Sequence, residues 1–330
     1  MSNPERDQLL ECAAAAAREA NLAELERVLE ESPEVLQARD AEGQTLLILA
    51  CKTATGDMAV PPPPGTPAQH QAVERILAAG ADPSASDNEG LSPLHIAAGV
   101  GNQDLVRFLL NAGAPREGHM MGAEGGSPLA LCLFYAKTEI AQVLADPPVP
   151  DNLRTAAALG RRLDRFVDGD ELSPQAADGV DFYRPYPFFP AWDRTNSRQE
   201  LLDEALCWSS RNGQCESMAA LVELGADVNA NPYRGTPLLW SVYDDRVEAA
   251  AWLLDHGADP DLRHDFGGAE HGKDAIAMHL AAQYGSLKCL ELLLDRGADP
   301  TIVDASFGGT PLGWAQHAEM EPSIGMLTQR

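Results

Sequence analysis

The sequence predicts an all-α solenoid of about nine helix-turn-helix repeats joined by short β-turn fingers. The main observation is internal repetition: the segment 92–114, SPLHIAAGVGNQDLVRFLLNAGA, returns with substitutions at 236–260 and 276–300. A second observation is the composition, since 45% of the 330 residues are hydrophobic and 22% are charged. Both values are typical of a folded soluble protein and exclude disordered, collagen-like and disulfide-scaffold classes.

A fixed spacing sets the register of the repeats. Gly101, Gly213 and Gly285 each precede a Gly-Ala pair by twelve residues, and Asp245 takes the same place in a further copy. This residue joins the two helices of a repeat and is counted as position zero, where we expect a left-handed backbone. Less regular copies are predicted at 11–36, 45–52, 70–83, 127–145, 153–167, 204–230 and from 310 onward.

The repeated unit resembles the ankyrin repeat, a 33-residue unit of two helices and a β-turn finger that starts T-P-L-H-x-A. The starts SPLHIA at Ser92, TPLLWS at Thr236 and TPLGWA at Thr310 carry the resemblance, which covers about four-fifths of the chain. It implies a stack in which neighbouring repeats together bury one continuous core. The first copy, with its alanine run at 13–17, and the last, which lacks a full second helix, are expected to be caps.

We predict three parts. Residues 1–167 hold about five degenerate repeats with a proline-rich loop at 53–69, residues 168–199 form an irregular aromatic-rich insertion, and residues 200–330 hold about four repeats. The four consecutive prolines at 61–64 favour an extended, solvated loop, for which a PxxP ligand is the less favoured interpretation.

The net charge and the motifs indicate which partners, compartments and cofactors to expect. The formal charge of −26 repels phosphate backbones and anionic lipid surfaces, so we expect neither nucleic acid nor membrane as a partner. The absence of a long apolar run and the polar, acidic start of the sequence predict a cytoplasmic protein. No cofactor is expected, because the sequence has no phosphate loop, dinucleotide fingerprint, nucleophile elbow or CxxC pair.

Cysteines and two histidines fall on structural positions of the repeat. Cys132, Cys215 and Cys289 stand where the other copies place a small apolar residue, so we interpret them as reduced core thiols. His95 and His279 occupy the histidine of T-P-L-H, which the resemblance implies is bonded to the neighbouring finger.

The insertion contains an unusually aromatic segment, FYRPYPFFPAW, at 182–192. Its three prolines exclude a helix or a central strand, and its rings must be buried somewhere. It either seals the joint between two half-arrays or walls a pocket on the concave face, with Phe188, Phe189 and Trp192 as binding residues.

The finger at 263–275 is longer than the others and carries histidines and carboxylates. These are His264, Asp265, Glu270, His271 and Asp274. A metal or acid-base site is one interpretation. An ordinary solvated finger tip is favoured, because no helical ligand spacing accompanies them.

Helical geometry puts position −5 of each first helix on one face with −2 and −1, the face that in ankyrin arrays lines the concave groove. On this face stand Phe134, Tyr135, Trp208, Trp240, Tyr243, Asp244, Tyr284 and Trp314, and the finger tips add Tyr233, Arg234, Phe266 and Phe307. A tryptophan at −5 can also serve only as packing between first helices. The number of rings favours a binding groove.

The preferred function is a non-enzymatic module that binds a protein or peptide in this groove, as the resemblance implies. An acidic rim of Asp244, Asp245, Asp265 and Glu270 predicts a partner with basic and apolar features. The alternative is a small-molecule-binding or catalytic protein with a pocket closed by 182–192. Its candidate polar groups are Arg184, Arg234, Asp244, His264, His271 and His317.

Overall fold

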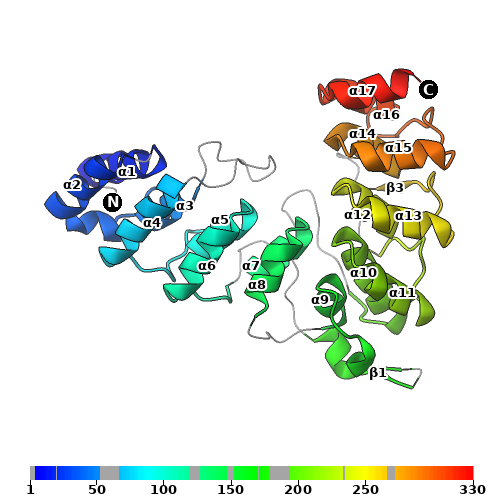
Figure 1. Cartoon of the computed structure of the whole chain (residues 1–330), viewed down its shortest axis with the longest axis horizontal. Coiled ribbons are helices and arrows are strands. Elements are labelled where there is room, and N and C mark those ends of the chain that lie inside the picture. The colour runs from blue at the N-terminus through cyan, green and yellow to red at the C-terminus, as the bar shows by residue number, and fades with distance from the viewer. Residues whose placement is uncertain are drawn as a thin grey trace. The chain divides into compact units, whose positions relative to one another are not determined.

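The computed structural model describes residues 4–19, 21–52, 67–118, 126–146, 152–169, 171–178, 194–232, 235–265 and 272–329. In these ranges the chain forms helix pairs and four short strands, which confirms the predicted all-α repeat solenoid (Figure 1). The proline-rich loop at 61–64 and the aromatic segment 182–192 lie outside the described residues.

Contacts divide the chain into two compact units. Among the described residues, the first unit runs to 146 and the second starts at 152. The helix at Leu153–Ala158 therefore packs with the second unit, whereas the sequence analysis grouped it with the repeats of 1–167. The reason is its contact with the long helix Arg198–Arg211, which follows it in the same stack.

The first unit consists of four helix pairs. They are α1 (Pro4–Arg18) with α2 (Leu22–Glu31), followed by the 3-10 helix η1 (Pro33–Gln37), α3 (Leu46–Cys51) with α4 (Pro67–Ala78), α5 (Pro93–Gly99) with α6 (Gln103–Asn111), and α7 (Pro128–Phe134) with α8 (Thr138–Leu144). The first helices α1, α3, α5 and α7 pack on one another in that order, so each repeat contacts its sequence neighbours.

The second unit begins with a single helix and continues with four pairs. Its elements are α9 (Leu153–Ala158), η2 (Asp164–Phe166), β1 (Val167–Asp168), β2 (Glu171–Leu172), η3 (Pro174–Ala177), α10 (Arg198–Arg211), α11 (Cys215–Glu223), α12 (Pro237–Tyr243), α13 (Val247–Asp255), β3 (His264–Asp265), β4 (Lys273–Ala275), α14 (Ala277–Tyr284), α15 (Leu287–Asp295), α16 (Pro311–His317) and α17 (Glu321–Thr328). The first helices α9, α10, α12, α14 and α16 form one stack.

A side-chain cap fixes the start of most first helices, among them α3, α5, α7, α12 and α16. The Ser92 hydroxyl accepts a hydrogen bond from the His95 N–H, and a proline follows the cap, which suits the first helical turn. His95 Nδ1 accepts from the Ser92 N–H, so the proton sits on Nε2, which donates to the Gly126 carbonyl of the next finger at 3.0 Å. His279 bonds Gly309 in the same way at 3.1 Å. The structural interpretation of both histidines is confirmed.

The turn between the two helices of a repeat is left-handed. Gly101, Gly213, Gly285 and Asp245 have φ values of 79°, 70°, 68° and 52°, which confirms the predicted register. Ala136, Gly160 and Glu319 hold the same place with φ values of 50°, 67° and 54°. Glycine adopts this conformation without strain, whereas a residue with a Cβ is penalised.

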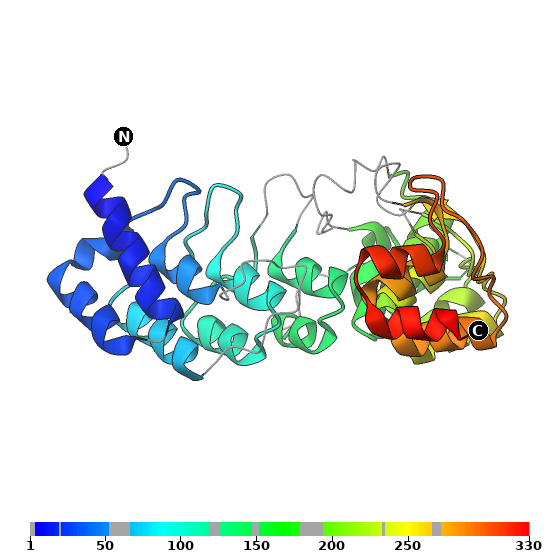
Figure 2. The same cartoon turned by 90° about the horizontal axis from the view of Figure 1, so that it is seen from above.

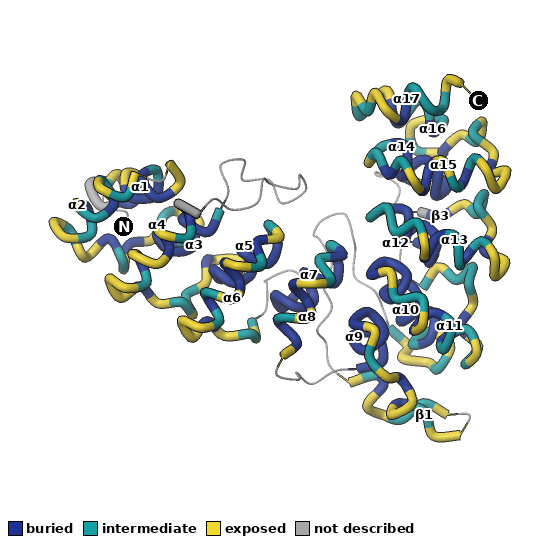
Figure 3. Tube along the Cα trace, in the orientation of Figure 1, coloured by how far each residue is buried: buried dark blue, intermediate teal, exposed yellow. Residues whose placement is uncertain are grey.

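The core lies between successive repeats (Figure 3). First helices are buried almost all round, while second helices are amphipathic: α6 buries Leu105, Val106 and Leu109 and leaves its other face in solvent. Cys132 and Cys289 are buried in this core as predicted, and Cys215 is half-buried.

Fingers of the first unit project from the same side of the helices (Figure 2). Two of them are described as tight turns, closed by the hydrogen bonds from Gly43 N to Asp40 O and from Gly90 N to Asp87 O. Neighbouring fingers are joined by Asn88 N donating to Glu42 O at 2.9 Å. In the second unit the longer finger forms the antiparallel pair β3–β4. The fingers are short, as predicted.

Two repeats differ from expectation. In the fifth, η2 and the hairpin β1–β2 follow α9 in place of a second α-helix, and Phe166 supplies the fully buried side chain. The last repeat was predicted to lack a full second helix, and this prediction was wrong, because α17 is present. Helix α17 forms there, and Pro322 is compatible with it because it lies in the first turn, where the missing N–H has no intrahelical partner to lose.

Replacing Gly285 by valine should destabilise the second unit by about 1–3 kcal/mol, because a β-branched residue is strained at φ 68°. Its Cβ would also lie 2.8 Å from Met320 Sδ. The exposed Lys288→Ala is the matched control, expected within about 0.5 kcal/mol of the parent. Urea unfolding measures both, and equal midpoints would contradict the assigned register.

Candidate interaction site

Two rows of side chains run along the stacked first helices of the second unit. Counted from the left-handed residue, position −5 holds Trp208, Trp240 and Trp314, and position −2 holds Arg211, Tyr243, Gln283 and His317. Because the helices stack in order, the −2 row places residues of consecutive repeats side by side, whereas Leu280 of the eighth repeat interrupts the tryptophans of the −5 row. The rows and the fingers beside them form the candidate site.

The tryptophans are covered by the fingers. Trp240 and Trp314 are each only 6% exposed. A Cβ built on Gly235 would lie 3.0 Å from the Trp240 indole nitrogen, and one on Gly309 would lie 3.0 Å from Trp314, so each indole packs closely against a finger glycine. These tryptophans therefore contribute packing, and the surface of the site comes from the residues beside them.

A buried arginine lies at the centre of the rows. The Arg211 guanidinium stands 4.4 Å from the Trp240 ring centroid and 4.8 Å from that of Tyr243. Its Nε lies 3.3 Å from Asp244 Oδ2. The carboxylate balances the buried charge, and cation–π contact holds both rings in place.

The tyrosine pair next to this arginine reaches the surface. Tyr243 and Tyr284 are in ring contact, with centroids 4.6 Å apart, and Tyr284 is 40% exposed. Asp245, expected on the acidic rim, has a left-handed backbone, and its carboxylate accepts a hydrogen bond from the Cys289 N–H at 2.9 Å and so caps α15. Its place on an acidic rim stays a prediction.

Asp304 organises the last finger. Its carboxylate accepts hydrogen bonds from the backbone N–H groups of Ser306, Phe307 and Gly309 and from the Trp314 indole N–H at 3.0 Å. Burial acts to raise the pKa of this carboxyl, but the four hydrogen bonds outweigh it and the pKa is lowered. The ionised carboxylate thus fixes the positions of both Phe307 and Trp314.

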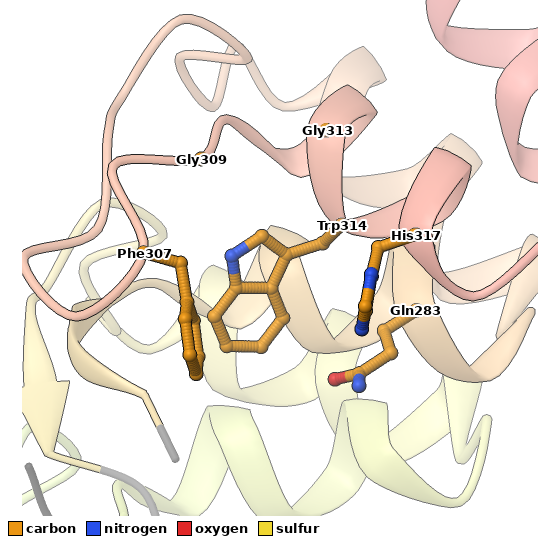
Figure 4. Close-up of a pocket in the computed structure, with 6 residues that line it drawn as sticks. All are labelled: Gln283, Phe307, Gly309, Gly313, Trp314 and His317. Carbon is orange, nitrogen blue, oxygen red and sulfur yellow. The ribbon is translucent and has the colours of Figure 1, made fainter. Parts of the chain in front are cut away.

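A pocket of about 430 Å³ opens beside this finger (Figure 4). It is lined by Gln283, Phe307, Gly309, Gly313, Trp314 and His317. The Phe307 and Trp314 rings are in edge contact at 6.1 Å, and Phe307 is 67% exposed. The Gln283 amide oxygen is buried but accepts no hydrogen bond from the residues that the structure describes. A buried unmet acceptor costs about 1–3 kcal/mol.

The histidine finger is structural in its described part. Burial, with a smaller contribution from the neighbouring His279, lowers the pKa of His264 to about 3. Its tip at 266–271, which includes Glu270 and His271, lies outside the described residues. Over the residues that are described, no group of three His, Cys, Asp or Glu side chains is placed to hold a metal ion.

Several predicted site residues fall elsewhere. Phe134 and Tyr135 belong to the first unit, where Phe134 is buried and their rings meet edge-on at 5.2 Å. Trp208 is 8% exposed and lies 5.6 Å from the Arg154 guanidinium. Six others, Phe188, Phe189, Trp192, Tyr233, Arg234 and Phe266, lie outside the described residues.

Three residues of the site were missed by sequence reasoning. Arg211 and Gln283 share the −2 row with Tyr243, and their register position alone could have identified them. Arg211 and Gln283 were missed because the candidate residues on this face were chosen mainly for their aromatic rings. Asp304 had no such signal, because its role depends on the turn geometry of the finger that it holds.

Models of the ankyrin repeat match residues 67–154, 191–264 and 274–305, which together make up more than half of the sequence. The chain belongs to the ankyrin repeat family. Ankyrin repeats are generally protein-interaction modules, and the predicted membership is confirmed.

Curated relatives carry the same repeats within longer proteins. The chain is 22% identical over 309 residues to the E3 ubiquitin-protein ligase KEG of Arabidopsis thaliana, covering 82% of this chain and 18% of that protein. It is 27% identical over 230 residues to the ankyrin repeat protein nuc-2 of Neurospora crassa, covering 67% and 19%. Human ankyrin repeat and SOCS box protein 16 is 28% identical over 195 residues, covering 56% and 40%.

The match spans less than a fifth of the length of the first two of these proteins and two-fifths of the third. A search of the helices that the structure describes finds none with the length and apolar character needed to cross a bilayer.

Asp304→Ala should destabilise the last repeat by about 3 kcal/mol, because it leaves several partly buried donors without an acceptor. The exposed Val303→Ala is the control in the same finger. Tryptophan fluorescence during urea unfolding measures both. A loss for Asp304→Ala no larger than that for the control would contradict the role given to this carboxylate.

Stability should fall on acidification through His264. Its folded pKa lies below the usual value near 6.5, so the unfolded chain binds the proton first, and stability present at pH 7 is lost as the pH falls below about 6.5. Between pH 7 and 5 this contributes about 2 kcal/mol. His264→Gln should remove that share of the pH dependence in urea titrations, whereas the exposed His256→Gln should retain it.

Proposed function

We propose that the second unit binds a protein or peptide through the −2 row, the adjoining Tyr284 at position −1 and the last finger, and that the chain acts as a non-enzymatic interaction module. The observation that carries this proposal is the exposure of two aromatic rings, Tyr284 and Phe307, next to buried side chains that hold them in place. Exposed, preorganised aromatic groups are typical of residues that dominate binding energy at interfaces.

Charge favours a partner with basic and apolar features. The formal net charge of the chain is −26, and Asp244 stands half-buried beside the row. Such a surface attracts a basic segment and raises its rate of association. Nucleic acids and anionic membranes are disfavoured as partners for the same reason.

The absence of enzymatic chemistry is part of the proposal. Burial raises the pKa of the Cys51, Cys132 and Cys207 thiols, which disfavours the reactive thiolate. Cytoplasmic localisation stays a prediction from the sequence.

A peptide library displayed on phage, selected against the whole chain, tests the proposal. Selected peptides should combine basic and apolar residues, and Tyr284→Ser should weaken their binding about tenfold or more, because the exposed ring is removed. Lys288→Ala, on the second helix of the same repeat, should leave affinity unchanged.

Thermal melting of each variant separates loss of binding from loss of fold. Tyr284→Ser is expected to stay folded with only a small drop in melting temperature, because the residue is 40% exposed and lies at the surface of the stack. Selected peptides that bind equally well to Tyr284→Ser and to the parent would contradict the assignment of this surface.

A further inference from the structure

We propose that the pocket at α16 takes the guanidinium group of an arginine in the bound partner, stacked on the exposed ring of Phe307 and next to Trp314 and the amide of Gln283. The inference rests on the proposed function, since it specifies one side chain of the peptide that the second unit binds. It concerns only residues of α14, α16 and the finger between 304 and 309.

The walls of the pocket suit a flat group. Phe307 is 67% exposed although it is a large apolar side chain, and its ring stands at 69° to the Trp314 indole. The backbone of Phe307 is bonded to Asp304 Oδ1 at 2.7 Å and the Trp314 indole N–H to Oδ2 at 3.0 Å, so both rings are anchored before a ligand arrives. A guanidinium stacks on such ring faces with its edges free for hydrogen bonds.

The pocket also offers an acceptor that lacks a donor. The Gln283 side chain extends toward the two rings with its amide oxygen on the Phe307 side (Figure 4). That oxygen is buried and receives no hydrogen bond from any described residue. Rotation about the last side-chain torsion, which is broad for glutamine, turns the oxygen to a ligand N–H.

Charge selects a cation over a neutral group. From 297 to 329 the chain has four carboxylates and no lysine or arginine; His317 lines the pocket, and Arg263 donates to the Val303 carbonyl of the same finger at 3.0 Å. One of them, Asp304, accepts the indole N–H of Trp314, and its negative charge adds to the negative potential at the ring face. A cation above the indole is therefore favoured by both the ring and the carboxylate behind it.

Arginine fits this combination better than other cations. Its guanidinium is planar, so it stacks on the exposed Phe307 ring and presents several N–H donors in one plane to the Gln283 oxygen. A lysine ammonium is compact and strongly hydrated, and a trimethylated lysine has no N–H to donate. The proposed occupant is therefore an arginine side chain of a basic peptide.

The test uses the whole chain labelled with ¹⁵N at its tryptophan indoles and titrated with Nα-acetyl-arginine methylamide. The Trp314 indole signal, assigned with Trp314→Phe, should shift and saturate at millimolar ligand. The citrulline analogue has nearly the same shape without the charge and should bind at least tenfold more weakly, and the lysine analogue should also bind more weakly.

Variants locate the binding. Phe307→Ala should lower affinity about tenfold, Gln283→Met should lower it severalfold, and Gln283→Glu should raise it because a carboxylate replaces the amide. Val303→Ala, in the same finger, should leave it unchanged. All four are compared by their indole spectra, so a variant that has lost its fold is recognised.

An unshifted Trp314 signal, or equal binding of the arginine and citrulline compounds, would overturn the inference, as would a small aromatic compound that binds while arginine does not. The proposed function is judged separately. If the selected peptides bind through Tyr284 but show no preference for arginine and lose no affinity with Phe307→Ala, only the arginine pocket is contradicted. If arginine binds saturably but no peptide is selected, the interaction module is contradicted instead.

Discussion

The left-handed residue between the two helices of each repeat is the constraint on which the rest of the second unit depends. It ends the first helix at a fixed point, so that the side chains two and five positions before it leave the helix on one side in every repeat. Stacking then aligns Trp208, Trp240 and Trp314 in one row and Arg211, Tyr243, Gln283 and His317 in the next. A one-residue shift in this turn would rotate a whole helix by about 100° and break both rows.

Along these rows, buried side chains hold the fingers in place, and exposed side chains form the surface. The indoles of Trp240 and Trp314 lie against finger glycines and hold the fingers to the helices, while Arg211 and Asp304 fix the orientation of the rings around them. Tyr284 and Phe307 then face solvent on a rigid base. A surface of this kind loses little conformational entropy when it binds a partner, which is the advantage of preorganisation.

Much of this fold could be predicted from the sequence, because repetition gives the same information several times. The capping residues, the left-handed turns and the roles of His95 and His279 all follow from one aligned unit. The structure differs from the prediction in repeats whose sequence differs from the other copies. In the fifth repeat, η2 and the β1–β2 hairpin take the place of the second helix, and Phe166 fills the core; in the last repeat, α17 forms although its sequence no longer matches the repeat.

The candidate site was less predictable for a related reason. Aromatic residues are visible in a sequence, but whether a ring is covered depends on the finger that folds over it, so Trp240 and Tyr284 could not be distinguished in advance. Contacts between repeats, such as the 3.3 Å approach of Arg211 to Asp244, join residues that no local pattern connects. The carboxylate of Asp304 depends in the same way on a turn that is specific to one finger.

At Asp245, a strained backbone within one repeat is combined with a hydrogen bond to the next repeat. A glycine in its place would relieve the backbone at φ 52°, yet only a side chain can reach across to the Cys289 N–H and cap the helix of the following repeat. The strain weakens one repeat taken alone, and the bond strengthens its junction with the next. In a one-dimensional array, weaker units with stronger junctions unfold together rather than one by one. This carboxylate therefore adds one hydrogen bond to the junction between the seventh and eighth repeats.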